Sequence, residues 1–159
     1  MGATILLLAA CTNVNFVSPQ PEYIDALTEI PKKYHGEFVD EDGLSYIVED
    51  STITVCDEDT LEMELGEALI IKKRGNYLFL NFLEVGYTYS MCAIKYNEYL
   101  NYTNATIYHP NIRDNAYLFN VIEKDSSFMH RTYLIDNVSV NQMSVLLKGS
   151  ESRRVFRLK

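Results

Sequence analysis

Tryptophan is absent from this 159-residue chain, and only three histidines, three cysteines and four prolines occur in it. The histidines, His35, His109 and His130, lie far apart and match no metal-binding spacing, so ordinary surface or half-buried histidines are the simpler interpretation. The chain also has no Gly-x-Ser-x-Gly elbow, no phosphate-binding glycine loop and no dinucleotide fingerprint. We therefore expect a protein that is not an enzyme and that carries no metal or cofactor.

No apolar run of the chain reaches the roughly 20 residues that span a bilayer. The segment Ile5–Ala10 is short, closes in small residues and is typical of a processed signal, although no Lys or Arg precedes it. Leu8-Ala9-Ala10-Cys11 resembles the lipobox of bacterial lipoproteins, in which the cysteine carries the lipid. An ordinary buried strand with a chance cysteine is the alternative.

The lipobox interpretation divides the chain into three parts. Residues 1–10 are the expected signal peptide, residues 11–21 a polar tether lipidated at Cys11, and residues 22–159 a single β-rich domain. Two or more acyl chains on Cys11 give stable membrane anchoring without a basic patch.

Positive charge is missing from residues 34–71, which hold twelve acidic residues, and the formal net charge of the whole chain is −8. A strongly acidic body argues against nucleic acid as a partner. The acidic block is either a solvated sheet face or a docking face for a basic protein, with Glu62 and Glu64 as the candidate docking residues. We expect the basic residues near the C-terminus to pair with part of this block.

Twelve tyrosines and seven phenylalanines favour β-strands. Asp40-Glu41-Asp42-Gly43 predicts a hairpin turn, and many other short β-rich segments are separated by turn residues. The sequence therefore predicts a mainly β domain, an antiparallel barrel or sandwich. The predicted strands span residues 36–39, 44–49, 52–55, 61–65, 69–72, 77–83, 87–96, 117–123, 130–135 and 155–158, and a further pair of strands is expected within residues 99–107. The strand over 77–83 is apolar on both faces, as in a central strand.

Two helices are expected beside the strands. Residues 21–31 begin and end at proline and carry apolar residues every three or four positions, which predicts a short N-terminal helix. Ser139 and Gln142 form a capping-box pattern, which predicts a C-terminal helix that ends at Gly149, before the last strand.

Cys56 and Cys92 remain if Cys11 carries lipid, and an exported protein meets an oxidising compartment. Both cysteines alternate with Ser or Thr along their strands, so both are expected on the more polar side. A disulfide between them and two separate buried thiols are both open.

Two short acidic segments are candidates for modification. Asp50-Ser51-Thr52 and Asp59-Thr60-Leu61 resemble the O-glycosylation sites of exported Bacteroidetes proteins, with Ser51 and Thr60 as the acceptors. The acidic turns lack the spacing of a calcium loop, so turn chemistry is the simpler explanation for them.

The order of a lipobox, a tether, a helix ending in Ile30-Pro31, many strands, a Ser-capped helix and a last strand resembles small uncharacterised lipoproteins of Bacteroidetes-type bacteria. The resemblance implies a lipocalin-like β domain held by lipid in the bacterial cell envelope, at the outer membrane on its periplasmic side. It implies no catalytic residue, and among site residues it carries over only Cys11.

Two binding functions are open at this point. A barrel of about eight strands has room for one small apolar ligand. Tyr77, Tyr87, Tyr89 and Tyr96 are candidate lining residues for such a cavity, although aromatic core packing is the commoner use. The alternative is an immunity or inhibitor lipoprotein that blocks a basic partner with its acidic face.

Overall fold

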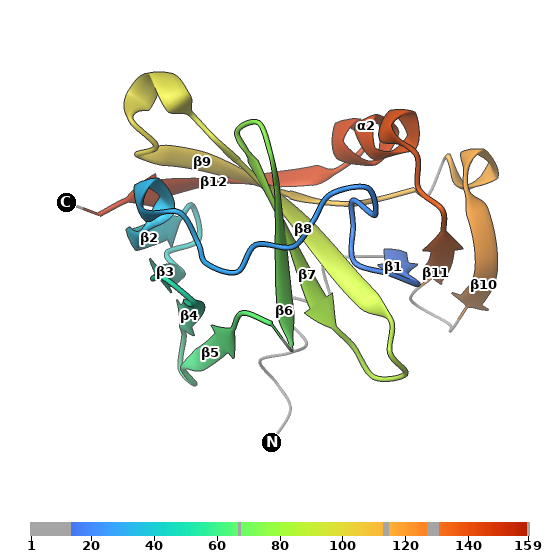
Figure 1. The fold of residues 1–159 in the computed structure, drawn as a ribbon, viewed down its shortest axis with the longest axis horizontal. Coiled ribbons are helices and arrows are strands. Elements are labelled where there is room, and N and C mark those ends of the chain that lie inside the picture. Colours follow the sequence, from blue (N-terminus) through green and yellow to red (C-terminus); the bar gives the residue numbers. More distant parts are fainter. Residues whose placement is uncertain (1–13, 67, 113–114, 127–130, 159) are drawn as a thin grey trace.

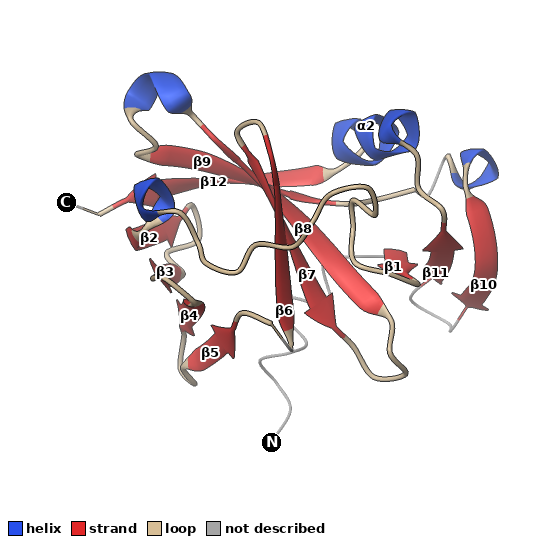
Figure 2. Cartoon of the chain, in the orientation of Figure 1, coloured by secondary structure: helices blue, strands red, loops and turns tan. Residues whose placement is uncertain are grey.

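The computed structural model describes residues 14–66, 68–112, 115–126 and 131–158, and these residues are mainly β (Figure 1, Figure 2). The expected signal peptide and Cys11 lie outside the described residues. Within them one α-helix, α2 (Val140–Lys148), precedes the last strand, and there are three short 3-10 turns, η1 (Lys32–Tyr34), η2 (Glu98–Leu100) and η3 (Ala116–Leu118). The strands are β1 (Val14–Phe16), β2 (Gly36–Asp40), β3 (Ser45–Val48), β4 (Thr52–Cys56), β5 (Leu61–Glu64), β6 (Leu69–Arg74), β7 (Tyr77–Leu83), β8 (Tyr89–Tyr96), β9 (Asn104–His109), β10 (Asn120–Ser126), β11 (Arg131–Asp136) and β12 (Glu151–Arg157).

The twelve strands form one sheet that does not close into a barrel. One edge of β8 pairs with β7, which pairs with β6, and the other edge of β8 pairs with both β9 and β1. From β9 the sheet continues through β12, β2, β3 and β4 to β5, and from β1 it continues through β11 to β10. The prediction of a mainly β, largely antiparallel domain is confirmed, and the sheet is open.

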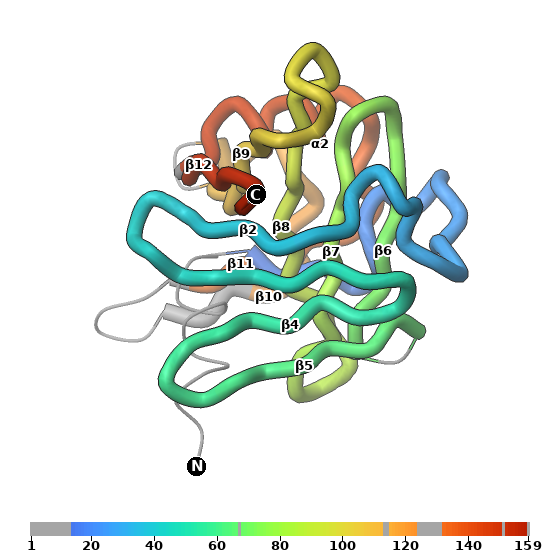
Figure 3. The backbone as a smooth tube through the Cα atoms, turned by 90° about the vertical axis from the view of Figure 1, so that its left-hand side faces the viewer, coloured from blue at the N-terminus to red at the C-terminus, as the bar shows by residue number. Residues whose placement is uncertain are grey.

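The open sheet folds into two layers. Strands β2 to β5 form an antiparallel meander, and this meander runs across strands β6 to β8 in Figure 3. Apolar side chains of the two layers meet in a first core. Its buried members include Phe38, Val48, Ile53, Leu69, Ile71, Leu78 and Leu80.

A second core lies on the opposite face of β7 and β8. Side chains alternate between the two faces of a strand, so Leu78 and Leu80 of β7 point into the first core while Phe79 points into the second. The prediction of a central strand over residues 77–83 is confirmed. The second core also holds side chains of β1, β11 and α2, among them Val14, Phe16, Ile135, Met143 and Leu146.

The C-terminal helix forms where the capping-box pattern predicts it. Ser139 Oγ accepts a hydrogen bond from the Gln142 N–H at 3.3 Å, and the Ser139 N–H donates to Gln142 Oε1 at 2.8 Å. Gly149 ends the helix, and its N–H donates to the Val145 carbonyl at 3.1 Å. The helix is buried against the second core through Met143 and Leu146.

The helix predicted over residues 21–31 is absent, and a series of turns and bends takes its place. The Leu27 N–H donates to the Ile71 carbonyl at 2.7 Å, and the Ile30 N–H donates to the Asp50 carbonyl at 2.7 Å. Because β6 and the β3–β4 turn accept these hydrogen bonds, the donors are not available to helical carbonyls four residues back.

The tether predicted over residues 11–21 is wrong for residues 14–21, which belong to the folded domain. Val14 and Phe16 are fully buried in β1, which pairs with β11 in parallel and with β8. Gln20 is fully buried as well. The alternation of Val14 and Phe16 is a strand signal, but three apolar-polar-apolar positions are too few to distinguish it from a linker.

We call residues 17–31 the strap, because they cross the sheet and pass along the edge of β6 (Figure 1). The buried Asn81 side chain fixes the strap: Oδ1 accepts from the Gln20 N–H at 2.6 Å and Nδ2 donates to the Gln20 carbonyl at 2.8 Å. Lys72 Nζ donates to the Pro19 and Pro21 carbonyls at 2.9 and 2.8 Å. Burial lowers the pKa of Lys72. The strap therefore covers an edge that would otherwise be open to pairing with another chain.

Candidate ligand-binding cavity

A cavity of about 120 Å³ lies within the first core, between the β2–β5 meander and strands β7, β8, β9 and β12. Apolar side chains form most of its lining. The buried lining residues include Ile30, Phe38, Val48, Ile53, Val55, Leu78, Leu80, Ala105, Ile107 and Val155. A space of this size with apolar walls holds a small apolar group more readily than it holds water.

Strand alternation places these side chains. On β8, Cys92, Ile94 and Tyr96 occupy every second position and all three line the cavity. On β5, Leu61 and Met63 line it, whereas Glu62 and Glu64 point outward and are exposed. The acids of this strand therefore face water, while Leu61 and Met63 face the core.

One end of the cavity rests on a cluster of aromatic rings. Tyr96 lines the cavity, and the ring of the buried Tyr34 lies 4.5 Å from it, centroid to centroid. Tyr102 meets Tyr34 edge to face at 5.5 Å. Lys33 Nζ donates to Tyr102 Oη at 3.1 Å, and this hydrogen bond raises the pKa of Lys33. Such ring pairs add about 0.5–1.5 kcal/mol each beyond their buried area, so this end is firmly packed.

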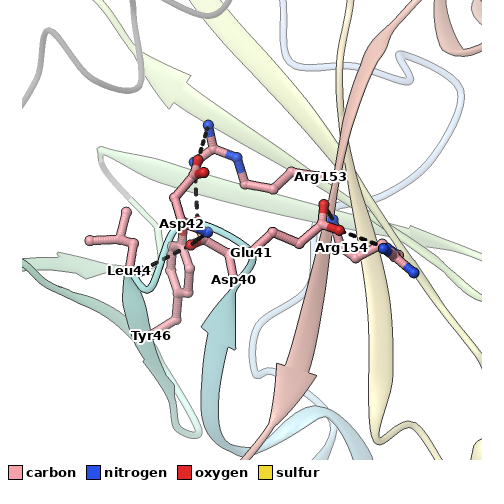
Figure 4. A network of polar contacts seen from close by, with 7 residues as sticks. All are labelled: Asp40, Glu41, Asp42, Leu44, Tyr46, Arg153 and Arg154. Atoms are coloured by element: carbon pink, nitrogen blue, oxygen red, sulfur yellow. Dashed lines mark hydrogen bonds and ion pairs between the residues drawn. The ribbon is translucent and has the colours of Figure 1, made fainter.

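The polar residues of the cavity lining are Tyr46, Asp57, His109 and Arg153. Asp40, whose side chain is fully buried, lies next to Tyr46 and Arg153 in the close-up of Figure 4. Arg153 Nη1 is 3.1 Å from Asp40 Oδ2, and Arg153 Nη2 is 3.0 Å from Asp42 Oδ2. The guanidinium thus bridges two carboxylates at the polar end of the cavity.

Asp40 accepts four hydrogen bonds in this network. Its Oδ1 accepts from the Leu44 and Asp42 N–H groups at 2.9 and 3.0 Å, and its Oδ2 accepts from Tyr46 Oη at 3.0 Å as well as from Arg153. Burial alone would raise the pKa of Asp40, but these donors together hold the pKa below its usual value. The same burial, together with the neighbouring Asp40 charge, raises the pKa of Tyr46. Asp40 is therefore ionised at neutral pH and Tyr46 is not.

A second pair joins the same turn to β12. Arg154 Nε donates to Glu41 Oε1 at 2.8 Å, and the Arg154 N–H donates to Glu41 Oε2 at 3.1 Å. These hydrogen bonds lower the pKa of Glu41. Together with the Arg153 pairs, they confirm the expectation that C-terminal bases pair with the acidic block.

The predicted lining by tyrosines holds for one residue of four. Tyr96 lines the cavity, but Tyr77 and Tyr89 pack against the second core. Tyr87 is 86% exposed, in the turn between β7 and β8. Successive side chains of β7 and β8 point to opposite faces, and both faces are buried. Apolar character alone therefore does not predict which of the two cores a side chain enters.

Cys56 and Cys92 are not joined by a disulfide. Cys92 is buried in the cavity wall, whereas Cys56 alternates with the inward-pointing Ile53 and Val55 and takes the other face of β4. The expectation that both cysteines lie on the polar side is therefore wrong for Cys92. Cys56 therefore points away from the cavity that Cys92 lines, so the two thiols are not directed toward each other.

The remaining sequence candidates lie at the surface. Ser51 is exposed in the β3–β4 turn, and Thr60 is exposed just before β5. Glu62 and Glu64 are exposed on β5, which is an end strand of the sheet. The structure thus brings none of these four side chains into the cavity.

Two of the three histidines lie within the described residues. His35 Nε2 lies 2.7 Å from the Ile30 carbonyl oxygen, His109 lines the cavity, and His130 is outside the described residues. In the part of the chain that the structure describes, no cluster of three or more His, Cys, Asp or Glu side chains is arranged to hold a metal ion.

Sequence reasoning missed Asp40, Tyr46 and Arg153 as parts of one site. Asp40 belongs to a hairpin turn, which explains its presence without any further role. Arg153 is 113 positions away along the chain, and only the pairing of β12 with β2 brings the two together. A local pattern carries no signal for such a contact.

None of the described helices has the length and apolar character needed to cross a membrane. Comparison of the chain with protein-family models, with curated proteins and with solved structures found no match.

Proposed function

We propose that the chain is a non-enzymatic binding protein whose β domain holds a small apolar ligand. The observation that carries this proposal is the cavity of about 120 Å³ with largely apolar walls. An engineered apolar cavity of about 150 Å³ stays dry and takes up benzene or xenon, so the expected guest is a single ring or a short aliphatic chain. A whole diacyl lipid is too large for it.

The proposal is tested by methyl NMR on protein labelled with ¹³C-methyl methionine and titrated with benzyl alcohol. Met63 lines the cavity, whereas Met143 lies in the second core. We expect the Met63 methyl signal to shift with saturation while the Met143 signal stays in place. Equal small shifts of both signals, or none, would contradict the proposal.

A pair of cysteine variants provides the matched control. Cys92→Leu adds side-chain volume inside the cavity and should abolish the response of Met63 to benzyl alcohol. Cys56→Leu makes the same change on the other face of β4 and should leave the response intact. If both variants bind like the parent chain, the ligand lies elsewhere.

We further propose that Cys11 is lipidated and holds this domain in the bacterial cell envelope, on the periplasmic side of the outer membrane. Two residues separate Cys11 from Val14, the first residue of β1, so the reach between them is at most about 11 Å. The domain would then lie close to the membrane surface. Radiolabelled palmitate should enter the native chain and not the Cys11→Ser variant. Unchanged processing and membrane fractionation of that variant would refute the anchor.

A second candidate function is docking of a basic protein, as in an immunity or inhibitor lipoprotein. It is favoured by the position of Glu62 and Glu64, exposed on β5 at the end of the sheet, where backbone groups are open to pairing. The double change Glu62→Lys and Glu64→Lys should then remove a partner from envelope pull-downs. Retention of every partner, together with a guest bound in the cavity, would favour ligand carriage alone.

A further inference from the structure

The polar end of the cavity carries more negative than positive charge. Asp57 and Arg153 are the lining residues with carboxylate or guanidinium groups. Arg153 is already matched by the carboxylates of Asp40 and Asp42, at 3.1 and 3.0 Å. The one guanidinium of the lining is thus paired with two carboxylates, and Asp57, which is exposed, has no cation among the ion pairs of the described residues.

Arg153 is committed to this network and is not available to an anionic ligand. Both of its terminal nitrogens point at carboxylates, and its partner Asp40 is held in place by the Leu44 N–H and the Tyr46 hydroxyl. Turning Arg153 toward a ligand carboxylate would leave the fully buried Asp40 side chain without its counter-ion. Removing one partner from a buried ion pair is strongly destabilising, because it leaves the other charge buried without a counter-ion.

We infer that the ligand is a small amphiphile with an apolar ring or short chain and a positively charged amine, and that the cavity rejects the matching carboxylate. This inference rests on the proposed carriage function and specifies its ligand class. The apolar part occupies the space beside Leu80 and Met63, and the ammonium group lies at the polar end, where Asp57 attracts it. Electrostatic complementarity of this kind discriminates between ligands of equal apolar size.

The test compares three ligands that share one ring: benzylamine, benzyl alcohol and benzoate. Each is titrated at pH 8, and binding is followed through the Met63 methyl signal. We expect benzylamine to bind about tenfold more tightly than benzoate, with benzyl alcohol between them. Opposite charges near a protein surface attract each other by at least the free energy that a tenfold ratio of affinities represents. The preference should shrink in 0.5 M salt.

A neighbouring pair of carboxylates gives the control variants. Asp57 lines the cavity and Asp59 does not, although both are exposed in the same turn. Asp57→Asn should weaken benzylamine binding about threefold and leave benzyl alcohol unchanged, whereas Asp59→Asn should change neither. The asparagine oxygen can still accept the hydrogen bond that Asp57 Oδ1 takes from the Glu58 N–H, so the turn is preserved.

The outcomes separate the two proposals. Binding of benzyl alcohol with benzoate equal to or tighter than benzylamine would overturn the inferred charge preference and leave carriage intact. Equal effects of Asp57→Asn and Asp59→Asn would also overturn it. Failure of all three ligands to shift Met63 would refute carriage itself and the charge preference with it.

Discussion

Replacing Asp40 by Asn tests the network that closes the polar end of the cavity. The variant keeps an oxygen for the Leu44 N–H but turns an NH2 group toward Arg153 and the Tyr46 hydroxyl, which are both donors. A hydrogen bond to a charged group contributes about 1.5–3 kcal/mol, and the Arg153 side chain is 34% exposed, so solvent moderates the loss. We therefore expect the free energy of unfolding at pH 7 to fall by about 2 kcal/mol.

The pH dependence of this difference follows from the lowered pKa of Asp40. A carboxyl group with a pKa lower in the folded than in the unfolded chain stabilises the fold fully above its unfolded pKa, near 4. That contribution is lost as the pH falls through the folded pKa. The gap between parent and Asp40→Asn should thus be largest at neutral pH and shrink below about pH 4.

Urea unfolding followed by circular dichroism from pH 7 to pH 3 measures the effect. The midpoint of Asp40→Asn should decrease with an unchanged slope, since the variant exposes the same surface on unfolding. The exposed Asp59→Asn should stay within about 0.5 kcal/mol of the parent. A gap that is equally large at pH 3, or no gap at pH 7, would refute this account of Asp40.

Further predictions concern the strap and the second core. Asn81→Leu leaves the buried Gln20 backbone groups unpaired and should cost about 2–3 kcal/mol, with faster amide exchange in the strap; a strap that exchanges at the parent rate would contradict its anchoring role. Ser139→Ala removes the cap of α2 and should cost about 1 kcal/mol by urea unfolding, with no loss expected if the cap is unimportant. Leu146→Ala should lower the free energy of unfolding by about 3 kcal/mol, well above the effect of Val140→Ala on the exposed face of α2. Equal effects of the two changes would contradict the buried position of Leu146.

Short sequence patterns predicted the elements that are stabilised by contacts between residues close together in the sequence. The capping box of Ser139 and Gln142 lies within one helical turn, and the turn at residues 40–43 joins strands that are neighbours in sequence. Both therefore formed where the sequence indicates. The clean alternation over residues 61–65 likewise fixed which side chains of β5 enter the cavity, because one face of that strand is exposed.

Long-range contacts decided the parts that the sequence did not predict. The segment over residues 21–31 has a helical pattern, but its donors at Leu27 and Ile30 are taken by β6 and the β3–β4 turn. The position of β1 depends on pairing with β11, more than 110 positions away along the chain. The sequence pattern did not predict the face of β8 that Cys92 occupies. Both faces of β8 are buried, so Ser and Thr neighbours do not indicate a solvent-exposed face.

The central claim is that the first core contains an apolar space that admits a small guest, and diffraction from crystals held under xenon tests it most directly. We expect one xenon atom between Leu80 of β7 and Ile53 of β4, and none in the Cys92→Leu variant under the same pressure. Crystals of the parent chain with no xenon between these two layers would contradict the claim.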